Sequence, residues 1–189
     1  MNAILDLLLT RRSVPAQMLA APGPNADQLQ TLLTIASRVP DHGKLAPWRF
    51  IVFEGEAREE AGRRMAEIVV ARQPEISEAR LEDERRRFAM APLVIAVVGR
   101  AAEHVKIPVI EQIYSAGAVC LNLEIAAHAM GYAACWLTDW PAYDPEARAA
   151  LGLGETETIV GFIHIGTPTI KPTDRPRPAL EDIVSRFGD

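Results

Sequence analysis

Apolar residues recur at helical spacing along much of this chain. Three apolar side chains within residues 2–10 lie three and four positions apart, which predicts a short amphipathic helix. Asn25 and Gln28 have the spacing of an N-terminal capping box, and the leucines that follow continue a helical face to residue 36. The same criteria predict further helices at 56–72, 77–88, 109–130, 146–151 and 180–187.

Four shorter segments have the pattern of strands. Residues 48–53 are rich in aromatic and β-branched side chains, and residues 158–165 alternate between two faces. Residues 93–98 are apolar without alternation, which predicts a central strand covered on both sides. A further strand is expected at 132–137. Because helices and strands alternate irregularly, the pattern predicts a three-layer α+β fold with a mixed sheet.

The segment 109–130 should form the longest helix, and Gly131 is suited to its C-terminal cap. This helix is apolar nearly all round, so it should lie in the core or at a subunit interface. By contrast, residues 77–88 carry many charges. We expect a solvated helix face there, with ion pairs Glu82/Arg86 and Asp83/Arg87 one turn apart.

Composition limits the class of protein. A chain of 189 residues fits one domain, 1–189, with a proline-rich C-terminal arm from about 166 to 189. The formal net charge of −5 argues against a nucleic-acid partner. The longest apolar run, 116–135, is interrupted by polar residues and does not predict a membrane span. The N-terminus lacks a basic secretory signal, and two cysteines in apolar segments favour a reducing, cytoplasmic setting.

The densest group of chemically active side chains lies in the loop before the first long strand. Arg38, Asp41, His42 and Lys44 stand close together there, followed by Trp48. Loops between rigid elements often carry function, and this one has more polar groups than a connector needs. A second candidate is Arg11-Arg12-Ser13, at the end of the first helix. From the residues alone, these cations are better explained as complements of the helix dipole than as an anion site.

Several common sites are absent from the sequence. It has no Gly-x-Gly-x-x-Gly fingerprint, no Gly-Lys-Ser/Thr loop and no Gly-x-Ser-x-Gly elbow. The four histidines lack metal-ligand spacing, so we expect no metal site. His128 and His164 lie in apolar segments and are interpreted as core or interface residues. Trp136 and Trp140 are most simply core residues, although an indole at a strand end can also wall a flat heterocycle.

Five segments together carry a family resemblance. They are the first helix ending in Arg11-Arg12-Ser13, the stretch from Arg38 to Phe50, the helix from Ser115 to Gly131, the strand ending in Cys135-Trp136-Leu137, and the segment from Val160 to Pro168. In this order, and over nearly the whole chain, they resemble the nitroreductase family of flavin mononucleotide (FMN) enzymes. The likeness is greatest to its short subgroup of NAD(P)H nitroreductases.

The resemblance implies an α/β/α nitroreductase-like fold whose mixed sheet is mainly antiparallel. It also implies a homodimer with FMN at the subunit interface. Arg11, Arg12 and Ser13 would hold the phosphate and ribityl end of the flavin, and Arg175 in the arm would be a late phosphate contact. Arg38 and His42 would reach the flavin from the partner chain, and either Lys44 or Arg38 would place a cation near the pyrimidine edge. Cys135, Trp136 and Leu137 would line the cofactor mainly through their backbone.

The activity implied is hydride transfer from NADH or NADPH through the flavin to an electron-poor small molecule, such as a nitroaromatic or a quinone, in ping-pong order. No side chain need act as a nucleophile. Three alternatives stay open: a dimer that stores or senses FMN without turnover, a flavin enzyme with dehalogenating or flavin-degrading chemistry, and a scaffold without flavin. The loop departs from the commoner family pattern, because Asp41-His42 replaces two serines, Lys44 an asparagine and Ala46 a glutamine.

Overall fold

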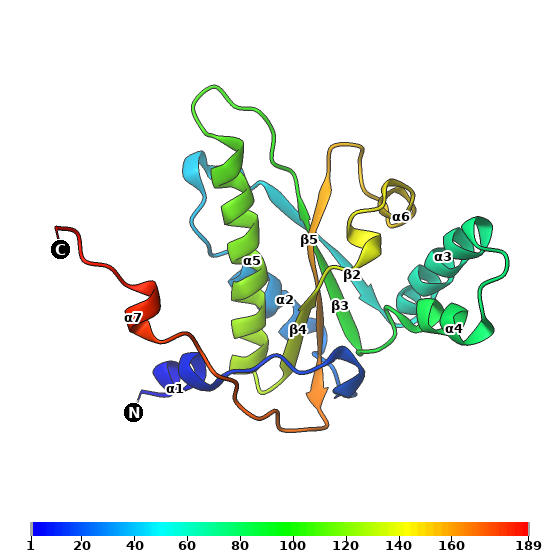
Figure 1. The fold of residues 1–189 in the computed structure, drawn as a ribbon, viewed down its shortest axis with the longest axis horizontal. Coiled ribbons are helices and arrows are strands. Elements are labelled where there is room, and N and C mark those ends of the chain that lie inside the picture. Colours follow the sequence, from blue (N-terminus) through cyan, green and yellow to red (C-terminus); the bar gives the residue numbers. More distant parts are fainter. Residues whose placement is uncertain (1, 189) are drawn as a thin grey trace.

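The computed structural model describes residues 2–188, and these form a sheet with helices on both faces (Figure 1). The helices are α1 (Ala3–Thr10), α2 (Ala26–Ala36), α3 (Glu56–Arg72), α4 (Glu78–Arg86), α5 (Val109–Ala129), α6 (Pro145–Ala150) and α7 (Leu180–Ile183). The strands are β1 (Leu19–Ala20), β2 (Trp48–Glu54), β3 (Leu93–Gly99), β4 (Ala133–Leu137) and β5 (Thr158–Pro168). Short 3₁₀ turns occur at η1 (Ala16–Met18), η2 (His42–Lys44) and η3 (Trp140–Ala142).

Strand β3 joins the two halves of the core, and every one of its residues is buried. Leu93, Ile95 and Val97 pack on one face with α2 and α5. The residues between them, such as Val94 and Ala96, pack on the other face with α3, α6 and Phe88. Since successive strand residues point to opposite faces, a continuous apolar run is what such a position requires. The expected three-layer α+β fold is confirmed.

The sheet is antiparallel in every strand pair that residues 2–188 form. β3 pairs with β2 on one side and with β5 on the other, and β5 also pairs with β4 and β1. The predicted sheet, mixed but mainly antiparallel, is therefore correct in its main part, while the described chain contributes no parallel pair. β5 continues to Pro168, past the expected start of the arm at about residue 166.

Most predicted helices are confirmed with small changes at their ends. The capping box at Asn25 and Gln28 forms in both directions. α5 ends as expected, with Gly131 at a φ of 86° and Tyr132 N–H donating back to the carbonyl of Ala127. The last helix is shorter than predicted, because α7 ends at Ile183 where the expected helix reached residue 187.

The predicted charge pairs of α4 are wrong. Glu82 contacts Arg85, and Arg87 makes a two-pronged ion pair with Glu84 at 2.7–2.8 Å. Arg87 and Glu84 turn toward the protein, where their side chains are less than one-fifth exposed. Pairs three residues apart form here because Arg87 at the helix end also reaches Asp139 on another element. This part of the charge run is thus a partly buried contact and not a fully solvated face.

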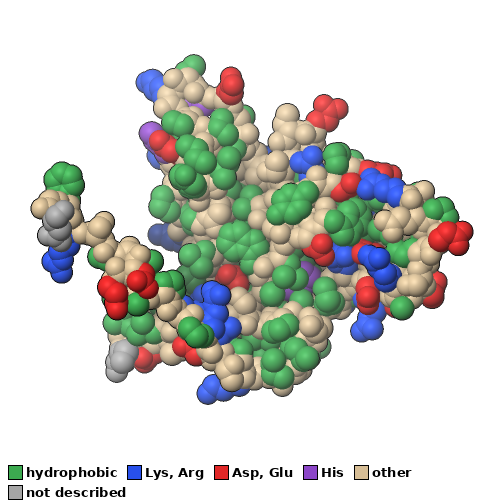
Figure 2. All heavy atoms as spheres, in the orientation of Figure 1, with side chains coloured by type: hydrophobic (Ala, Val, Ile, Leu, Met, Phe, Trp, Pro, Cys, Tyr) green, Lys and Arg blue, Asp and Glu red, His purple; other side chains and the backbone are tan. Residues whose placement is uncertain are grey.

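Large apolar side chains lie exposed on three helices. α1 exposes Leu5 and Leu9 and has no fully buried residue, although its pattern is amphipathic. The outer surface of α5 exposes Ile110 and Tyr114, and Figure 2 shows apolar side chains gathered along this helix. Every apolar residue of α7 is exposed as well. Among residues 2–188, no helix is both long enough and apolar enough to cross a membrane.

The interpretation of His164 as a core residue is confirmed, since it is only 3% exposed. Its ring Nδ1 nevertheless has no hydrogen-bond partner among the described residues. Burial, helped by the positive charge of Arg87, lowers the pKa of His164 to about 4 from its usual 6.5. The imidazole is therefore neutral in the folded protein.

We predict that His164 weakens the fold in acid. The unfolded chain takes up a proton below its ordinary pKa while the folded chain does not, so stability should fall as pH drops below about 6.5. Between about pH 7.5 and about pH 5.5 the loss attributable to this group is about 1 kcal/mol. Urea denaturation at both pH values, in the wild type and in His164→Met, measures it. Equal pH dependence in the two proteins would contradict the assignment.

Candidate functional site

Arginine side chains from the two ends of the chain line one small cavity. Its volume is about 270 Å³, and its lining consists of Arg11, Arg12, Ser13, Arg175 and Arg177. The first three follow α1, and the other two lie in the proline-rich arm, which returns past the C-terminal end of α5 (Figure 1). Figure 2 shows Lys and Arg side chains clustered there. The structure thus brings the N-terminal arginine pair together with Arg175, as the family resemblance implied.

Hydrogen bonds fix the arm against the segment after α1. The guanidinium of Arg12 donates to the carbonyl of Thr173 and lies 3.7 Å from the carboxylate of Asp174. The carbonyl of Arg12 is in turn 2.9 Å from the ring Nε2 of His128 on α5. The cavity walls are therefore held by contacts outside the cavity.

A buried carboxylate lies behind the cavity. Glu124 on α5 is 4% exposed, and its oxygens lie 3.5 Å from a guanidinium nitrogen of Arg11 and 3.5 Å from Ser13 Oγ. The Nε of Arg11 is buried and has no hydrogen-bond partner among the described residues. An unpaired buried donor costs about 1–3 kcal/mol, more when it is charged. An anion in the cavity offers the acceptor that this group lacks.

The charge balance of the cavity favours a phosphate-sized anion. Four guanidinium groups line it, and the carboxylates that contact them are those of Glu124 and Asp174. Guanidinium groups bind phosphate and carboxylate through paired, charge-assisted hydrogen bonds. The interpretation of Arg11 and Arg12 as mere complements of the helix dipole is insufficient, since the arm adds two more cations.

The cavity adjoins the start of β4. The N–H of Val14 donates to the carbonyl of Ala134 at 3.2 Å, which fixes Ser13 next to this strand. Cys135 is buried, whereas Trp136 and Leu137 are each more than one-third exposed. The indole of Trp136 donates to the carbonyl of Val160 at 3.2 Å and lies across Gly161, where a Cβ would meet it at 2.1 Å. Only glycine leaves room for the ring there.

Neither cysteine is prepared for nucleophilic chemistry. Burial, and to a smaller extent the negative charge of Glu124, raises the pKa of the Cys135 thiol. The same causes raise the pKa of Cys120. Both are free thiols. Within residues 2–188 no group of three or more His, Cys, Asp and Glu side chains is arranged to hold a metal ion.

The polar loop before β2 has a fixed conformation. The carboxylate of Asp41 accepts the backbone N–H groups of Leu45 at 3.1 Å and Ala46 at 2.9 Å. Lys44 and Ala46 have positive φ angles of 56° and 45°, which cost energy for residues with a Cβ. His42 lies 2.7 Å from the carboxylate of Glu111, at the start of α5.

Within one chain the loop and the arginine cavity do not meet. His42 contacts Glu111, whereas Arg11 and Ser13 contact Glu124, thirteen residues further along the same helix. At a rise of about 1.5 Å per residue, these contacts are about 20 Å apart. His42 is therefore separate from the cavity in the described chain, whereas the carbonyl of Arg38 accepts from Asn122, two residues before Glu124 on α5.

Three functional candidates of the structure were missed from the sequence. Arg177 lies two residues after Arg175, so the repeated Arg-Pro pattern of the arm was an available signal. Glu124 was noted only as an interruption of an apolar run, although a lone acid in an apolar helix is itself informative. No local pattern in the sequence indicated that Arg87 would form ion pairs with both Glu84 and Asp139.

Comparison with known proteins shows the family of this chain. The model of the nitroreductase family matches residues 8–167. The "putative NAD(P)H nitroreductase YdjA" of Escherichia coli strain K12 is 37% identical over 167 residues, which cover 88% of this chain and 89% of YdjA. The chain therefore belongs to the nitroreductase family, and it is an oxidoreductase.

Solved structures show the same fold. A nitroreductase-like family protein from Bacillus cereus superposes with a TM-score of 0.84 at 22% identity, covering 100% of this chain and 98% of that one. A nitroreductase with bound FMN from Bacteroides fragilis has a TM-score of 0.71 at 19% identity, covering 99% and 100%. At these identities the likeness concerns the fold.

Proposed function

We propose that this protein is an FMN-dependent oxidoreductase that takes hydride from NADH or NADPH and passes it to an electron-poor acceptor, such as a nitroaromatic or a quinone. The observation that carries the proposal is the arginine-lined cavity next to β4, in a chain of the nitroreductase family. The family and fold support a flavin oxidoreductase in general, and the nitroreductase of the same fold from Bacteroides fragilis was solved with bound FMN.

The residues present fit the cofactor. The cavity is large enough for a phosphate and has the complementary charge, and the unpaired Nε of Arg11 lacks an acceptor that a phosphate oxygen would provide. Arg11, Arg12, Ser13 and Arg175 would hold the phosphate, with Arg177 beside them. Cys135, Trp136 and Leu137 would line the rest of the cofactor along β4.

When bound, FMN would supply the hydride chemistry, with the nicotinamide and the acceptor using the site in turn, in ping-pong order. The residues of the chain itself would bind the cofactor and orient it. The thiol of Cys135 stays protonated and offers no nucleophile, since its pKa is raised. Trp136 would provide a fixed apolar wall, because its indole is hydrogen-bonded and seated on Gly161.

The proposal includes a homodimer with the cofactor at its interface. The exposed apolar surfaces of α1, α5 and α7 favour burial against a second copy. Arg38, His42 and Lys44 would then act on the partner's cofactor, with Lys44 or Arg38 placing positive charge near its ring. A reducing, cytoplasmic setting is consistent with two free, buried cysteines.

The first experiment tests cofactor and donor together. Purified protein should be yellow, and anaerobic addition of NADH or NADPH should bleach the flavin absorbance at one equivalent per bound FMN. Steady-state oxidation of the donor with a quinone or a nitroaromatic then separates an enzyme from a flavin-storing dimer. A colourless protein that fails to take up FMN would exclude the proposal.

The arginine cavity makes a prediction about the phosphate. The double substitution Arg175→Gln and Arg177→Gln should weaken FMN binding by about 10–100-fold, because two charge-assisted contacts are lost. Riboflavin, which lacks the phosphate, should bind the variant and the wild type equally. Fluorescence titration of the apoprotein measures both affinities.

The matched control is Arg186→Gln, since Arg186 is an exposed arginine of the same arm and does not line the cavity. It should leave both affinities unchanged. A double variant that loses riboflavin and FMN equally would mean that the arm supports the fold and not the phosphate.

The loop makes a separate prediction. His42→Ala should reduce FMN retention more than it reduces stability, because this half-exposed side chain makes one surface contact, to Glu111. Glu111→Gln weakens the same contact without removing the imidazole and should retain FMN better. Gel filtration followed by flavin absorbance measures retention, and urea denaturation measures stability. Unchanged FMN affinity in His42→Ala would refute the proposal that this loop contacts the partner's FMN.

A further inference from the structure

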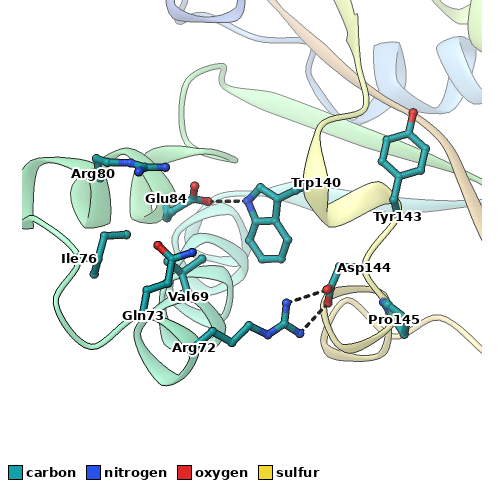
Figure 3. A pocket seen from close by; sticks show the side chains of 10 residues that line it. All are labelled: Val69, Arg72, Gln73, Ile76, Arg80, Glu84, Trp140, Tyr143, Asp144 and Pro145. Atoms are coloured by element: carbon teal, nitrogen blue, oxygen red, sulfur yellow. Dashed lines mark hydrogen bonds and ion pairs between the residues drawn. The ribbon is translucent and has the colours of Figure 1, made fainter.

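A second, larger cavity lies away from the arginine cavity. Its volume is about 610 Å³, within the range of small-molecule sites. It is bounded by α3, α4 and the η3–α6 segment, on the face of the sheet opposite α5 (Figure 1). The ten lining residues are Val69, Arg72, Gln73, Ile76, Arg80, Glu84, Trp140, Tyr143, Asp144 and Pro145, and none of them lines the arginine cavity (Figure 3).

Trp140 forms a rigid aromatic wall of this cavity. Its indole N–H donates to the carboxylate of Glu84 at 3.1 Å, and Arg87 grips that carboxylate with two nitrogens. The guanidinium carbon of Arg87 lies 6.0 Å from the indole centroid. Figure 3 shows the ring projecting between α3 and the η3–α6 segment. Because the indole is already oriented, a ligand stacking on it loses little side-chain entropy there.

A second ion-pair group fixes the opposite wall. Arg72 donates to both oxygens of Asp144, at 2.7 and 3.1 Å, and to Glu146 at 2.6 Å. Asp144 also accepts the backbone N–H of Ala147 and so caps α6. The charges of Arg72, Asp144 and Glu84 are thus engaged in ion pairs and hydrogen bonds that hold the walls.

Three polar side chains of the lining make no side-chain hydrogen bond or ion pair within residues 2–188. These are the guanidinium of Arg80, the amide of Gln73 and the phenol of Tyr143. Only Arg80 among them is charged. Both carboxylates of the lining, Glu84 and Asp144, are already paired with arginines, so Arg80 is the one cation of the lining without a carboxylate partner among residues 2–188.

We propose that this cavity is a second small-molecule site, distinct from the flavin site, and that it binds a flat aromatic acid. The aromatic body would lie against Trp140 and the apolar side chains of Val69 and Ile76. The carboxylate would pair with Arg80, whose planar guanidinium matches it with two parallel hydrogen bonds. The proposal does not depend on the chemistry at the flavin site, because the two sites share no residue.

Isothermal titration with naphthoate tests the proposal, using the protein as purified with any bound flavin retained. The uncharged carboxamide of the same ring system serves as the second probe. Naphthoate should bind with one site per chain at this cavity and more tightly than the carboxamide. Arg80→Gln should weaken naphthoate about tenfold and remove the preference over the carboxamide, since one charge-assisted pair is lost.

Val69→Phe fills the cavity from α3 and should abolish this binding. Two matched controls lie on the same helices as the tested positions without lining the cavity: Val70→Phe on α3 and Arg86→Gln on α4. Both should bind naphthoate within about twofold of the wild type. Circular dichroism and thermal unfolding check that each variant is folded. If Val69→Phe does not fold, the proposal is tested by Arg80→Gln, which changes an exposed side chain.

The outcomes separate this site from the flavin site. Binding that disappears in Val69→Phe while the flavin absorbance spectrum is unaffected supports the proposal. Binding that perturbs the flavin spectrum and persists in both Val69→Phe and Arg80→Gln overturns it. Absence of heat with the wild type at millimolar naphthoate also overturns it.

Discussion

The fold depends on the burial of β3 on both faces. Its seven residues are all buried, and alternate side chains pack into two separate hydrophobic clusters, one on each face of the sheet. A strand in this position can carry no polar chemistry, because an unpaired polar group would be costly on either side. The polar and charged groups of functional interest are therefore displaced to the end of β4, to the two ends of α5 and to the outer face of α3 and α4.

The elements that this burial dictates could be predicted from the sequence. β3, α3 and α5 were found within a residue or two, because each has a strong apolar pattern or a clear cap. The errors lie where tertiary contacts decide. Arg87 pairs with Glu84 and Asp139, since the indole of Trp140 brings these groups together, and no spacing within α4 encodes that. α7 is short, since no core residue of the described chain covers its apolar side.

The candidate site was predictable in its parts and not in its assembly. Arg11-Arg12-Ser13 and Arg175 could be named from family resemblance, but the residues alone favoured a dipole role for the first pair. A contact between distant parts of the sequence changes this interpretation. Arg175 and Arg177 of the arm lie about 160 residues after Arg11 and Arg12, and they line the same cavity. Glu124 became significant for the same reason. A buried acid is tolerable on α5 only because Arg11 and Ser13 lie against it.

The position of the loop explains why one chain is an incomplete unit under the proposed function. Glu124, which lies behind the cavity suited to a phosphate, and Glu111, which contacts His42 of the loop, are about 20 Å apart along α5. The surface of α5 between them is apolar and exposed, with Ile113, Tyr114 and Leu121 directed away from the core. Pairing two copies through this surface would bury it, and it would let each loop approach the other copy's β4. A single apolar helix would then account for both the dimer and the shared site.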